Sequence, residues 1–167
     1  MTVNKIIREA TPDDRSAILD LTARAFGQLD EVNIIEQLER DGDILFELVA
    51  DFDGKIVGHI LFYPIGVFGK LGAAWLGPLS VDPWMKREKI GTNLVNNGLK
   101  RLKESGAPLV FVLGHEWFYP RFGFTVEAAR EFETPYKGPH FFALRFRFGP
   151  PMSGRLIFPD AFGTPGA

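Results

Sequence analysis

The stretch of sequence that decides the fold is residues 79–94, which read Leu-Ser-Val-Asp-Pro-Trp-Met-Lys-Arg-Glu-Lys-Ile-Gly-Thr-Asn-Leu. Its first residues close an apolar run of strand length, and Pro83 ends that pattern. From Ile90 onward, apolar residues recur at helical spacing as far as Leu102, and Gly106 then ends the pattern. The stretch therefore predicts a strand that leads through a charged turn into the start of a helix.

The turn between this strand and this helix is strongly basic. Residues 86–104 contain six Lys or Arg residues and two Glu residues, in a chain whose net charge is −2. The free N–H groups at a helix N-terminus, together with the helix dipole, bind phosphate oxygens. One interpretation is therefore a phosphate-binding turn, and the other is a solvated helix start that carries surface lysines.

Downstream of the helix, the pattern changes to that of strands. Residues 109–113 (Leu-Val-Phe-Val-Leu) form a fully apolar run, which is typical of a strand buried on both faces. A strand, a helix and a buried strand in this order predict a parallel crossover. Alternating apolar residues from Phe142 to Phe148 predict a final strand. From Gly149 onward, Gly and Pro supply eight of nineteen residues, so we expect irregular chain there, anchored by the apolar side chains Leu156, Ile157, Phe158 and Phe162.

Upstream of residue 79, the sequence first predicts a strand and two helices. Residues 3–8 are short and β-branched, as in an opening strand. Thr11, Pro12 and Asp14 have the spacing of a helix start with a capping box. Apolar residues at helical spacing follow in two groups, first Ile18, Leu21, Thr22 and Ala25, then Ile34, Ile35 and Leu38 before Gly42.

Three further strands are expected between the second helix and residue 81. The apolar runs 44–50 and 56–68 flank Asp53 and Gly54, the dipeptide that tight hairpins favour. A third strand over residues 74–81 is expected to be separated from the second by Gly69 and Gly72. The region therefore predicts an antiparallel meander, and the whole chain a mixed α/β layer.

Composition limits the classes of protein that this chain can be. It has 167 residues, 46% of them apolar, which is enough for the core of one domain. The absence of cysteine excludes disulfides, zinc–thiolate sites and thiol nucleophiles. The net charge of −2 argues against a nucleic-acid binder, and the longest uncharged run, residues 56–69, is too short to span a bilayer. The first residues lack the apolar segment of a signal peptide, so we expect a cytoplasmic protein with no metal, nucleic-acid or membrane partner.

Two motifs in this order resemble landmarks of the GNAT superfamily of N-acetyltransferases. Residues 81–83 (Val-Asp-Pro), followed by 86–91 (Lys-Arg-Glu-Lys-Ile-Gly), are similar to its acyl-CoA motif, Val-x-Pro and then Gln/Arg-x-x-Gly-x-Gly/Ala. Residues 118–124 (Phe-Tyr-Pro-Arg-Phe-Gly-Phe) are similar to the aromatic stretch after the next strand in that family. These stretches resemble most the YhbS-like subgroup of predicted bacterial acetyltransferases. Two residues depart from the motif, because Lys86 replaces Gln or Arg and Lys89 replaces the first glycine.

The resemblance implies an α/β fold with a mixed, mostly antiparallel central sheet flanked by helices, in which a splayed parallel strand pair forms the acyl-CoA cleft. Residues 1–148 would be the N-acetyltransferase domain, and residues 149–167 a Pro/Gly-rich tail packed on it. Acetyl-CoA would be the co-substrate, its pantetheine pairing with the strand backbone and its pyrophosphate lying on the amides of the turn. The residues expected to bind it are Leu79, Ser80, Val81, Lys86, Arg87, Glu88, Lys89, Ile90, Gly91, Thr92 and Tyr119.

The resemblance also implies acetyl transfer to a primary amine by direct attack in a ternary complex. Tyr119 stands at the position of the family's usual tyrosine, where it would protonate the departing thiolate or only hydrogen-bond CoA or water. His115 is the first candidate for the base that deprotonates the amine, because imidazole titrates near neutral pH. The alternatives for this base are two carboxylates, Glu116 and Asp82. The remaining histidines, His59 and His140, are expected to be ordinary polar or core residues.

The acceptor is expected to be a small-molecule or peptide amine. Residues 30–53 hold nine acids and one cation, Arg40, which is either an acidic wall that favours a cationic amine or a solvated acidic face. A second hypothesis, motivated by Lys89, is a non-catalytic acyl-CoA-binding or interaction module. A third is a structural partner subunit whose Phe-rich edge strand, residues 142–148, pairs with another chain, for example in a homodimer.

Overall fold

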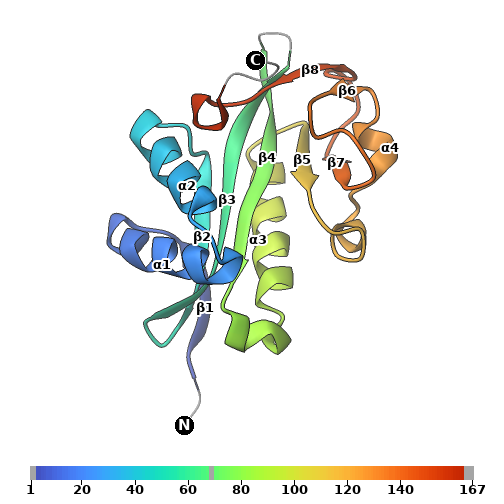
Figure 1. Cartoon of the computed structure of the whole chain (residues 1–167). Coiled ribbons are helices and arrows are strands. Elements are labelled where there is room, and N and C mark those ends of the chain that lie inside the picture. The colour runs from blue at the N-terminus through green and yellow to red at the C-terminus, as the bar shows by residue number, and fades with distance from the viewer. Residues whose placement is uncertain (1–2, 68–69, 164–167) are drawn as a thin grey trace. The chain divides into compact units, whose positions relative to one another are not determined.

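The computed structural model describes residues 3–67 and 70–163, which form a mixed α/β fold (Figure 1). Contacts divide the chain into two compact units, Met1–Phe62 with Gly77–Lys100 and Tyr63–Leu76 with Arg101–Ala167. The described strand pairs are antiparallel except β4 with β5 and β6 with β8. This confirms the expected fold class. Among the described residues, no helix has the length and apolar character needed to cross a membrane.

The strands of the first unit begin with β1 (Lys5–Glu9), which pairs antiparallel with β2 (Phe46–Phe52). Strand β2 pairs antiparallel with β3 (Lys55–Val67), as the sequence predicts. Asp53 and Gly54, both with positive φ, form the tight turn between them. The Asp51 carboxylate accepts the Gly54 N–H at 2.7 Å and so stabilises this turn.

The helices of the first unit are α1 (Arg15–Phe26) and α2 (Asp30–Asp41). The predicted capping box is confirmed, with the Thr11 N–H donating to Asp14 Oδ2 at 2.8 Å. A 3-10 turn, η1 (Pro12–Asp14), precedes the α-helix, so α1 begins later than the cap spacing alone suggests. Most side chains predicted at helical spacing are buried, whereas Ala25 and Ile34 are half-buried. Gly42 ends α2 in the left-handed conformation.

Helix α3 (Ile90–Glu104) packs closely against β3 in the first unit. A Cβ on Gly98 would lie 2.5 Å from the Phe62 ring, and a Cβ on Gly58 would lie 2.5 Å from an Ile90 methyl group. Only glycine allows this approach, because real Cβ contacts are not that short. Gly98, which the sequence places on the apolar face of the helix, is therefore a packing residue.

The strands of the second unit contain the parallel pair. Strand β4 (Lys70–Val81) pairs parallel with β5 (Leu109–Leu113), from Ala73–Leu109 to Trp75–Phe111. Strand β5 also pairs antiparallel with β7 (Phe141–Arg145). The parallel ladder thus ends two residues before β5 does. Gly72 lies inside β4, so the prediction that it separates two strands is wrong: its φ is not positive, and the extended chain continues through it. Gly69, the other predicted separator, lies outside the described residues.

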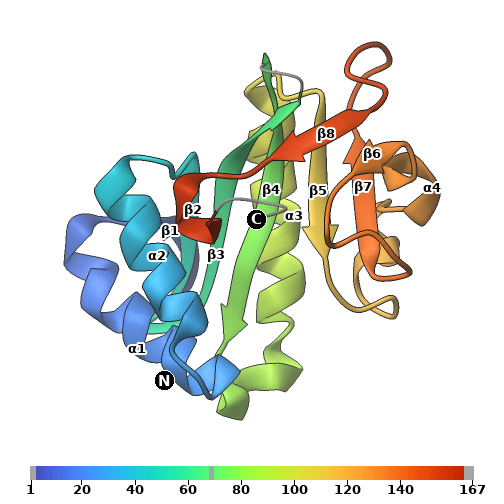
Figure 2. The same cartoon turned by 45° about the horizontal axis from the view of Figure 1, so that its top comes forward.

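The end of the chain is more regular than expected. Strand β8 (Gly154–Ile157) pairs antiparallel with Gly66–Val67 of β3 and parallel with β6 (Phe132–Glu133) (Figure 2). Leu156 and Phe158 are buried, as the anchoring hypothesis requires, but Ile157 is half exposed. The expectation of irregular chain after residue 149 is therefore wrong for this segment, because backbone pairing outweighs the Gly and Pro content around it.

Strand β7 is shorter than its alternating sequence predicts. It ends at Arg145, and Phe148 is fully exposed, so the strand does not reach residue 148. The Arg145 guanidinium donates to the carbonyl oxygens of Gly149 at 2.8 Å and Pro151 at 2.7 Å. These two hydrogen bonds hold a bend directly after the strand, which explains why the alternation beyond Arg145 is not strand.

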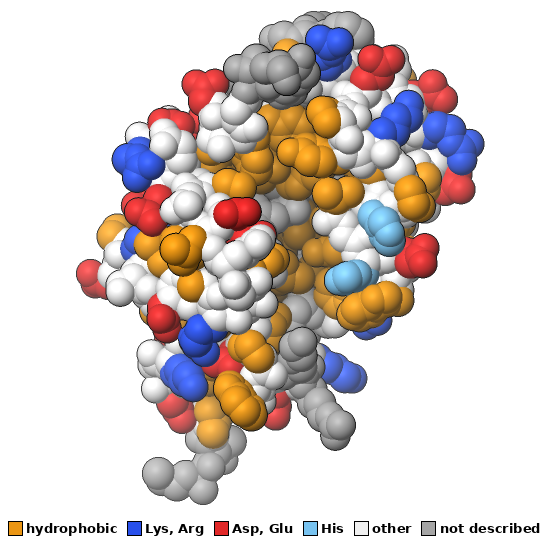
Figure 3. Space-filling view, viewed as in Figure 1, with side chains coloured by type: hydrophobic (Ala, Val, Ile, Leu, Met, Phe, Trp, Pro, Cys, Tyr) orange, Lys and Arg blue, Asp and Glu red, His pale blue; other side chains and the backbone are white. Residues whose placement is uncertain are grey.

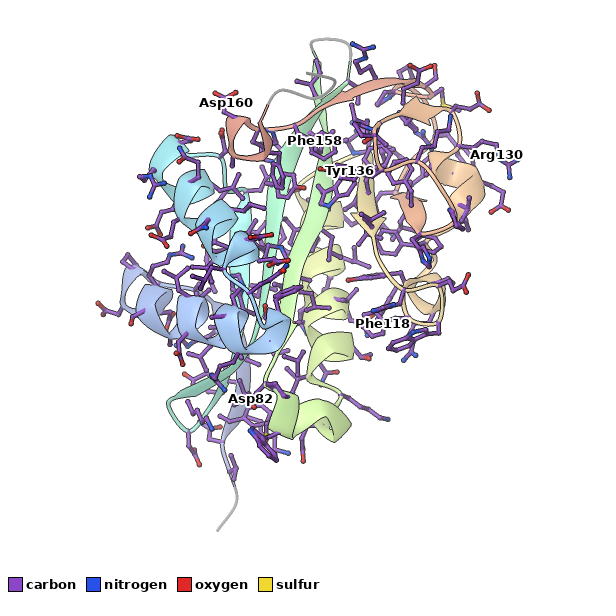
Figure 4. All side chains as sticks on the ribbon, in the orientation of Figure 1. Asp82, Phe118, Arg130, Tyr136, Phe158 and Asp160 are labelled. Atoms are coloured by element: carbon purple, nitrogen blue, oxygen red, sulfur yellow. The ribbon has the colours of Figure 1, made fainter. Side chains whose placement is uncertain are left out.

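Aromatic rings fill the core of the second unit. The Trp75 ring lies 5.9 Å from Phe141 and 5.0 Å from Phe158, measured between ring centres. The rings of Tyr136 and Phe158 meet edge to face, with their centres 5.4 Å apart. Both residues are labelled in Figure 4. The high phenylalanine content of the chain thus has a structural explanation, because ring pairs at such distances stabilise beyond the area that they bury.

Candidate functional site

The predicted cofactor residues other than Tyr119 follow one another from the end of β4 to the first turn of α3, within the first unit. Tyr119 lies in the second unit. Leu79 and Val81 are half-buried, whereas Ser80 is buried. A 3-10 segment, η2 (Pro83–Glu88), joins the strand to the helix. Trp84 in this segment is 91% exposed. The strand–turn–helix order predicted for residues 79–94 is therefore confirmed.

Asp82 organises this turn. Its carboxylate accepts the Trp84 N–H at 3.0 Å and pairs with Arg24 at 3.2 Å and Lys55 at 3.8 Å. Asp82 is labelled in Figure 4. The backbone hydrogen bond from Trp84, followed by the guanidinium of Arg24, lowers the pKa of Asp82. The ionised carboxylate of Asp82 therefore caps η2. Asp82, an alternative candidate for the catalytic base, thus has a structural role.

Lys89 stands where the resembling motif has its first glycine, and it has a left-handed backbone, with φ of 56°. Its carbonyl accepts the Asn93 N–H at 3.0 Å, so Lys89 is the residue from which α3 begins. A non-glycine residue in this conformation costs roughly 1–2 kcal/mol. Position 89 therefore has a backbone conformation that glycine adopts without strain, and in this chain an exposed lysine occupies it.

The N-terminus of α3 provides amide groups for an anion. The N–H groups of residues 90–92 precede the first intrahelical acceptor, so the helix itself leaves them free. Ile90 is buried, while Gly91 and Thr92 are half-buried. Glu88 is bound to Lys5 of β1 at 2.7 Å. Lys86 and Arg87 lie in η2, with side chains outside the described part of the structure.

The second unit holds the predicted catalytic residues. Tyr119 begins η3 (Tyr119–Phe122), and its N–H donates to the His115 carbonyl at 3.2 Å. The tyrosine ring lies on Gly114, where a Cβ would be 2.2 Å from the ring. Burial raises the pKa of the Tyr119 phenol above its ordinary value, so the hydroxyl stays protonated across the physiological range.

The structure also brings a further histidine to this region of the second unit. The Gly114 N–H donates to the His140 carbonyl at 3.0 Å, and His115 stacks on Trp117 at 5.1 Å. His115, Glu116 and His140 are exposed. His59, in contrast, has no exposed surface. Figure 3 shows histidine side chains, coloured pale blue, on the surface of one face.

The first unit contains a buried polar cluster that the sequence patterns did not predict. His59 Nε2 lies 2.7 Å from Glu47 Oε2, and Arg15 donates two hydrogen bonds to Glu47, at 2.9 Å and 2.6 Å. Arg15 also pairs with Glu39. Burial alone raises the pKa of Glu47, but the hydrogen bonds from His59 and Arg15 lower it to about 2. The only signal in the sequence was one polar residue inside each of two apolar runs, Glu47 in residues 44–50 and His59 in residues 56–68.

The acidic stretch 30–53 is less free than its composition suggests. Glu39 and Glu47 pair with Arg15, and Asp51 pairs with Arg8 at 3.1 Å. Asp53 accepts the Asn4 N–H at 3.0 Å. Cations from outside the stretch therefore neutralise part of its negative charge. The acids that remain to attract a cationic acceptor lie mainly in α2 and in the residues directly after it.

Comparisons with known proteins agree with these motifs. A family model described as an acetyltransferase (GNAT) domain matches residues 6–126. The uncharacterized N-acetyltransferase YjhQ of Escherichia coli is 34% identical over 146 residues, covering 83% of this chain and 81% of YjhQ. The uncharacterized N-acetyltransferase YhbS of the same organism is 33% identical over 136 residues, covering 80% of this chain and 81% of YhbS.

Two solved structures are similar over almost the whole chain. The crystal structure of Escherichia coli YhbS in complex with CoA has a TM-score of 0.90 at 28% identity, covering 100% of this chain and 98% of that one. The structure of a GNAT family acetyltransferase from Brucella melitensis in complex with acetyl-CoA has a TM-score of 0.83 at 32% identity, covering 95% of this chain and 98% of that one.

Proposed function

Because this chain belongs to the GNAT family of N-acetyltransferases, we propose that it transfers the acetyl group of acetyl-CoA to a primary amine by direct attack in a ternary complex. The observation that carries the proposal is the free N-terminus of α3 behind the basic turn at the end of β4. The complexes of YhbS with CoA and of the Brucella protein with acetyl-CoA support the choice of cofactor.

The cofactor would use backbone groups more than side chains. Pantetheine would pair with the backbone at residues 79–81 as an added strand, and the pyrophosphate would lie on the amides of residues 87–92. Lys86 and Lys89 would add positive charge, in the place of the motif's Gln or Arg and of its glycine. A β4 backbone N–H would polarise the thioester carbonyl and stabilise the oxyanion that forms there.

Two proton movements complete the reaction. The amine nitrogen loses a proton to a base and forms a bond to the acetyl carbon, the carbon–sulfur bond breaks, and the departing thiolate takes a proton. The raised pKa of Tyr119 supports it as the acid, because the phenol reaches the transition state protonated. His115 is the first candidate for the base, with Glu116 as the alternative. Asp82, the other alternative, already caps η2.

The acceptor that we propose is a cationic small molecule or peptide amine. The acids of α2 that remain after internal pairing support this choice, since they would attract a positive charge. The N-acetyltransferase family match favours the enzyme over a non-catalytic module with the same fold.

Calorimetric titration of the purified protein with acetyl-CoA, with adenosine diphosphate as the control ligand, tests the cofactor. Saturable binding tighter than that of the control is expected. A panel of amines then tests turnover, with Tyr119→Phe and Lys86→Ala compared with wild type on a confirmed substrate. No binding at millimolar acetyl-CoA would overturn the proposed function and favour the interaction module.

A further inference from the structure

Asp82 lies where the two segments proposed to bind acetyl-CoA meet, and it is 0% exposed. The strand backbone of residues 79–81 comes directly before it, and the amides of residues 87–92 come at the end of η2 and the start of α3. A buried charge is costly unless it is paired and hydrogen-bonded, so the partners of this carboxylate indicate what it does in the turn.

Hydrogen bonds at Asp82 hold both the end of the strand and the start of the turn. The Asp82 N–H donates to the Val57 carbonyl of β3 at 2.8 Å. The Asp82 carbonyl accepts the Met85 N–H at 2.9 Å, and the carboxylate accepts the Trp84 N–H at 3.0 Å. One residue therefore fixes the start of η2 to the sheet.

Two cations from elsewhere in the first unit compensate the charge of Asp82. Arg24, in the last turn of α1, donates a hydrogen bond to Asp82 Oδ2 at 3.2 Å. The Lys55 ammonium, at the start of β3, lies 3.8 Å from the same oxygen, and the Lys55 side chain is 70% exposed. A charge-assisted hydrogen bond to a buried carboxylate is stronger than a longer, exposed ion pair, so Arg24 is the main partner.

The other end of η2 is held less firmly. Glu88 pairs with Lys5 of β1 at 2.7 Å, but the two side chains are 43% and 51% exposed. Exposed pairs contribute little to stability, so the placement of the turn depends mainly on its buried end at Asp82. Because η2 leads through Lys89 directly into α3, a shift at Asp82 would also displace the amides of residues 87–92.

We propose that Arg24 is a positioning residue for acetyl-CoA: through the Asp82 carboxylate, it holds η2 so that the backbone of residues 79–81 and the amides of residues 87–92 keep the placement that the cofactor needs. Such preorganisation strengthens binding because less order has to be imposed when the ligand arrives. The role rests on the proposed function, in which those two segments bind acetyl-CoA. The link from Arg24 to the turn does not depend on that function.

Hydrogen–deuterium exchange of the full chain without ligand tests the link. In Arg24→Gln, the amides of residues 84–92 should exchange about fivefold faster, the effect of one lost hydrogen bond. The amides of α2 and the circular dichroism spectrum should stay unchanged. Arg24→Lys retains the positive charge and should restore slow exchange. An unchanged rate at residues 84–92 in Arg24→Gln would overturn the proposal.

Calorimetric titration with acetyl-CoA, in the absence of an amine, tests the positioning role. Arg24→Gln should raise the dissociation constant by about fivefold, and Arg24→Lys should keep it within about twofold of wild type. Asp82→Asn retains an oxygen for the Trp84 N–H but loses the charge, so it should show the same increase as Arg24→Gln. If Arg24 acts through Asp82, the double variant should bind no more weakly than either single variant.

Asp20→Asn is the matched control. Asp20 is a second carboxylate that pairs with Arg24, at 3.3 Å, but it lies one helical turn earlier on α1 and its side chain is 74% exposed. Its replacement removes a partner of Arg24 without touching Asp82 or the turn. Asp20→Asn should therefore leave both the exchange rates and acetyl-CoA binding unchanged.

The outcomes separate this proposal from the proposed function. Equal acetyl-CoA binding by wild type and Arg24→Gln would overturn the positioning role and leave the proposed function standing. Additive losses in the double variant, or an equal loss in Asp20→Asn, would also overturn it, because Arg24 would then not act through Asp82. A wild-type protein that does not bind acetyl-CoA would overturn the proposed function and the positioning role together.

Discussion

Glu47 and His59 form a buried hydrogen bond of 2.7 Å between neighbouring strands, and no local pattern in the sequence indicates that they meet. Neither residue is needed by the cofactor motif. Their contact nevertheless decides how the first unit responds to acid and to the loss of a single charge.

Acid should destabilise the protein in two steps. The folded-state pKa of His59 is lowered by burial, so its contribution to stability is lost as the pH falls below its ordinary value of 6.5. The pKa of Glu47 is lowered from 4.5 to about 2, so its contribution is present above pH 4.5 and is lost between pH 4.5 and 2. Urea unfolding at pH 7.5, 5.5 and 3.5 measures this. In Glu47→Gln the second step should be smaller, and an unchanged acid profile in that variant would contradict the assignment.

Arg15→Ala should cost about 3 kcal/mol of unfolding free energy, because it leaves the buried Glu47 carboxylate with His59 alone. Arg40→Ala is the control, since Arg40 is exposed and its contact with Glu36 is 4.0 Å long. Exposed pairs of that kind contribute little, so the control should change stability by less than about 0.5 kcal/mol. Urea unfolding measures both variants. Similar losses of unfolding free energy would show that the buried cluster contributes no more to stability than an exposed ion pair.

Lys89→Gly should stabilise the protein by about 1 kcal/mol, because glycine adopts the left-handed conformation without strain. Lys89→Ala removes the same charge but keeps a Cβ, so it should not stabilise. Thermal unfolding distinguishes the two. Acetyl-CoA titration of both variants then shows whether the ammonium contributes to binding: a loss shared by both indicates charge, and a gain confined to glycine indicates backbone fit.

Tyr119→Phe should lower kcat by about 10²–10⁴-fold if the hydroxyl donates the proton to the thiolate. The fold should be retained, because the ring keeps its packing on Gly114 and Phe124. The raised pKa also predicts that wild-type activity is not lost through Tyr119 up to pH 10. Rates measured on a confirmed amine check both statements, and an unchanged kcat in Tyr119→Phe would restrict the hydroxyl to binding.

The parts of the fold that could be predicted have local physical causes. The capping box at Thr11 and Asp14 and the hairpin turn at Asp53 and Gly54 need only a few neighbouring residues, and both are confirmed. The end of β7 depends instead on hydrogen bonds that the Arg145 side chain makes to a later bend. Alternation alone could not reveal it, because the apolar pattern continues past the bend.

The candidate site divides in the same way. The strand–turn–helix order of residues 79–94 follows from local patterns, and the structure has that order. The Glu47–His59 contact joins residues twelve positions apart across two strands, so only the register brings them together. Strand β8 was missed for a related reason, since its pairing with β3 links segments about ninety residues apart, from Gly66–Val67 to Leu156–Ile157.

The three tryptophans differ sharply in exposure, and this gives the protein its own optical reporters. Trp75 is buried among aromatic rings, whereas Trp84 is 91% and Trp117 is 69% exposed. Trp84 lies in the turn before α3, and Trp117 lies beside His115. Emission that a soluble quencher can reach therefore comes from those two places and not from the core. In single-tryptophan variants, the fluorescence of Trp84 would report on the turn before α3, and that of Trp117 would report on the segment around His115. Neither measurement needs an attached dye.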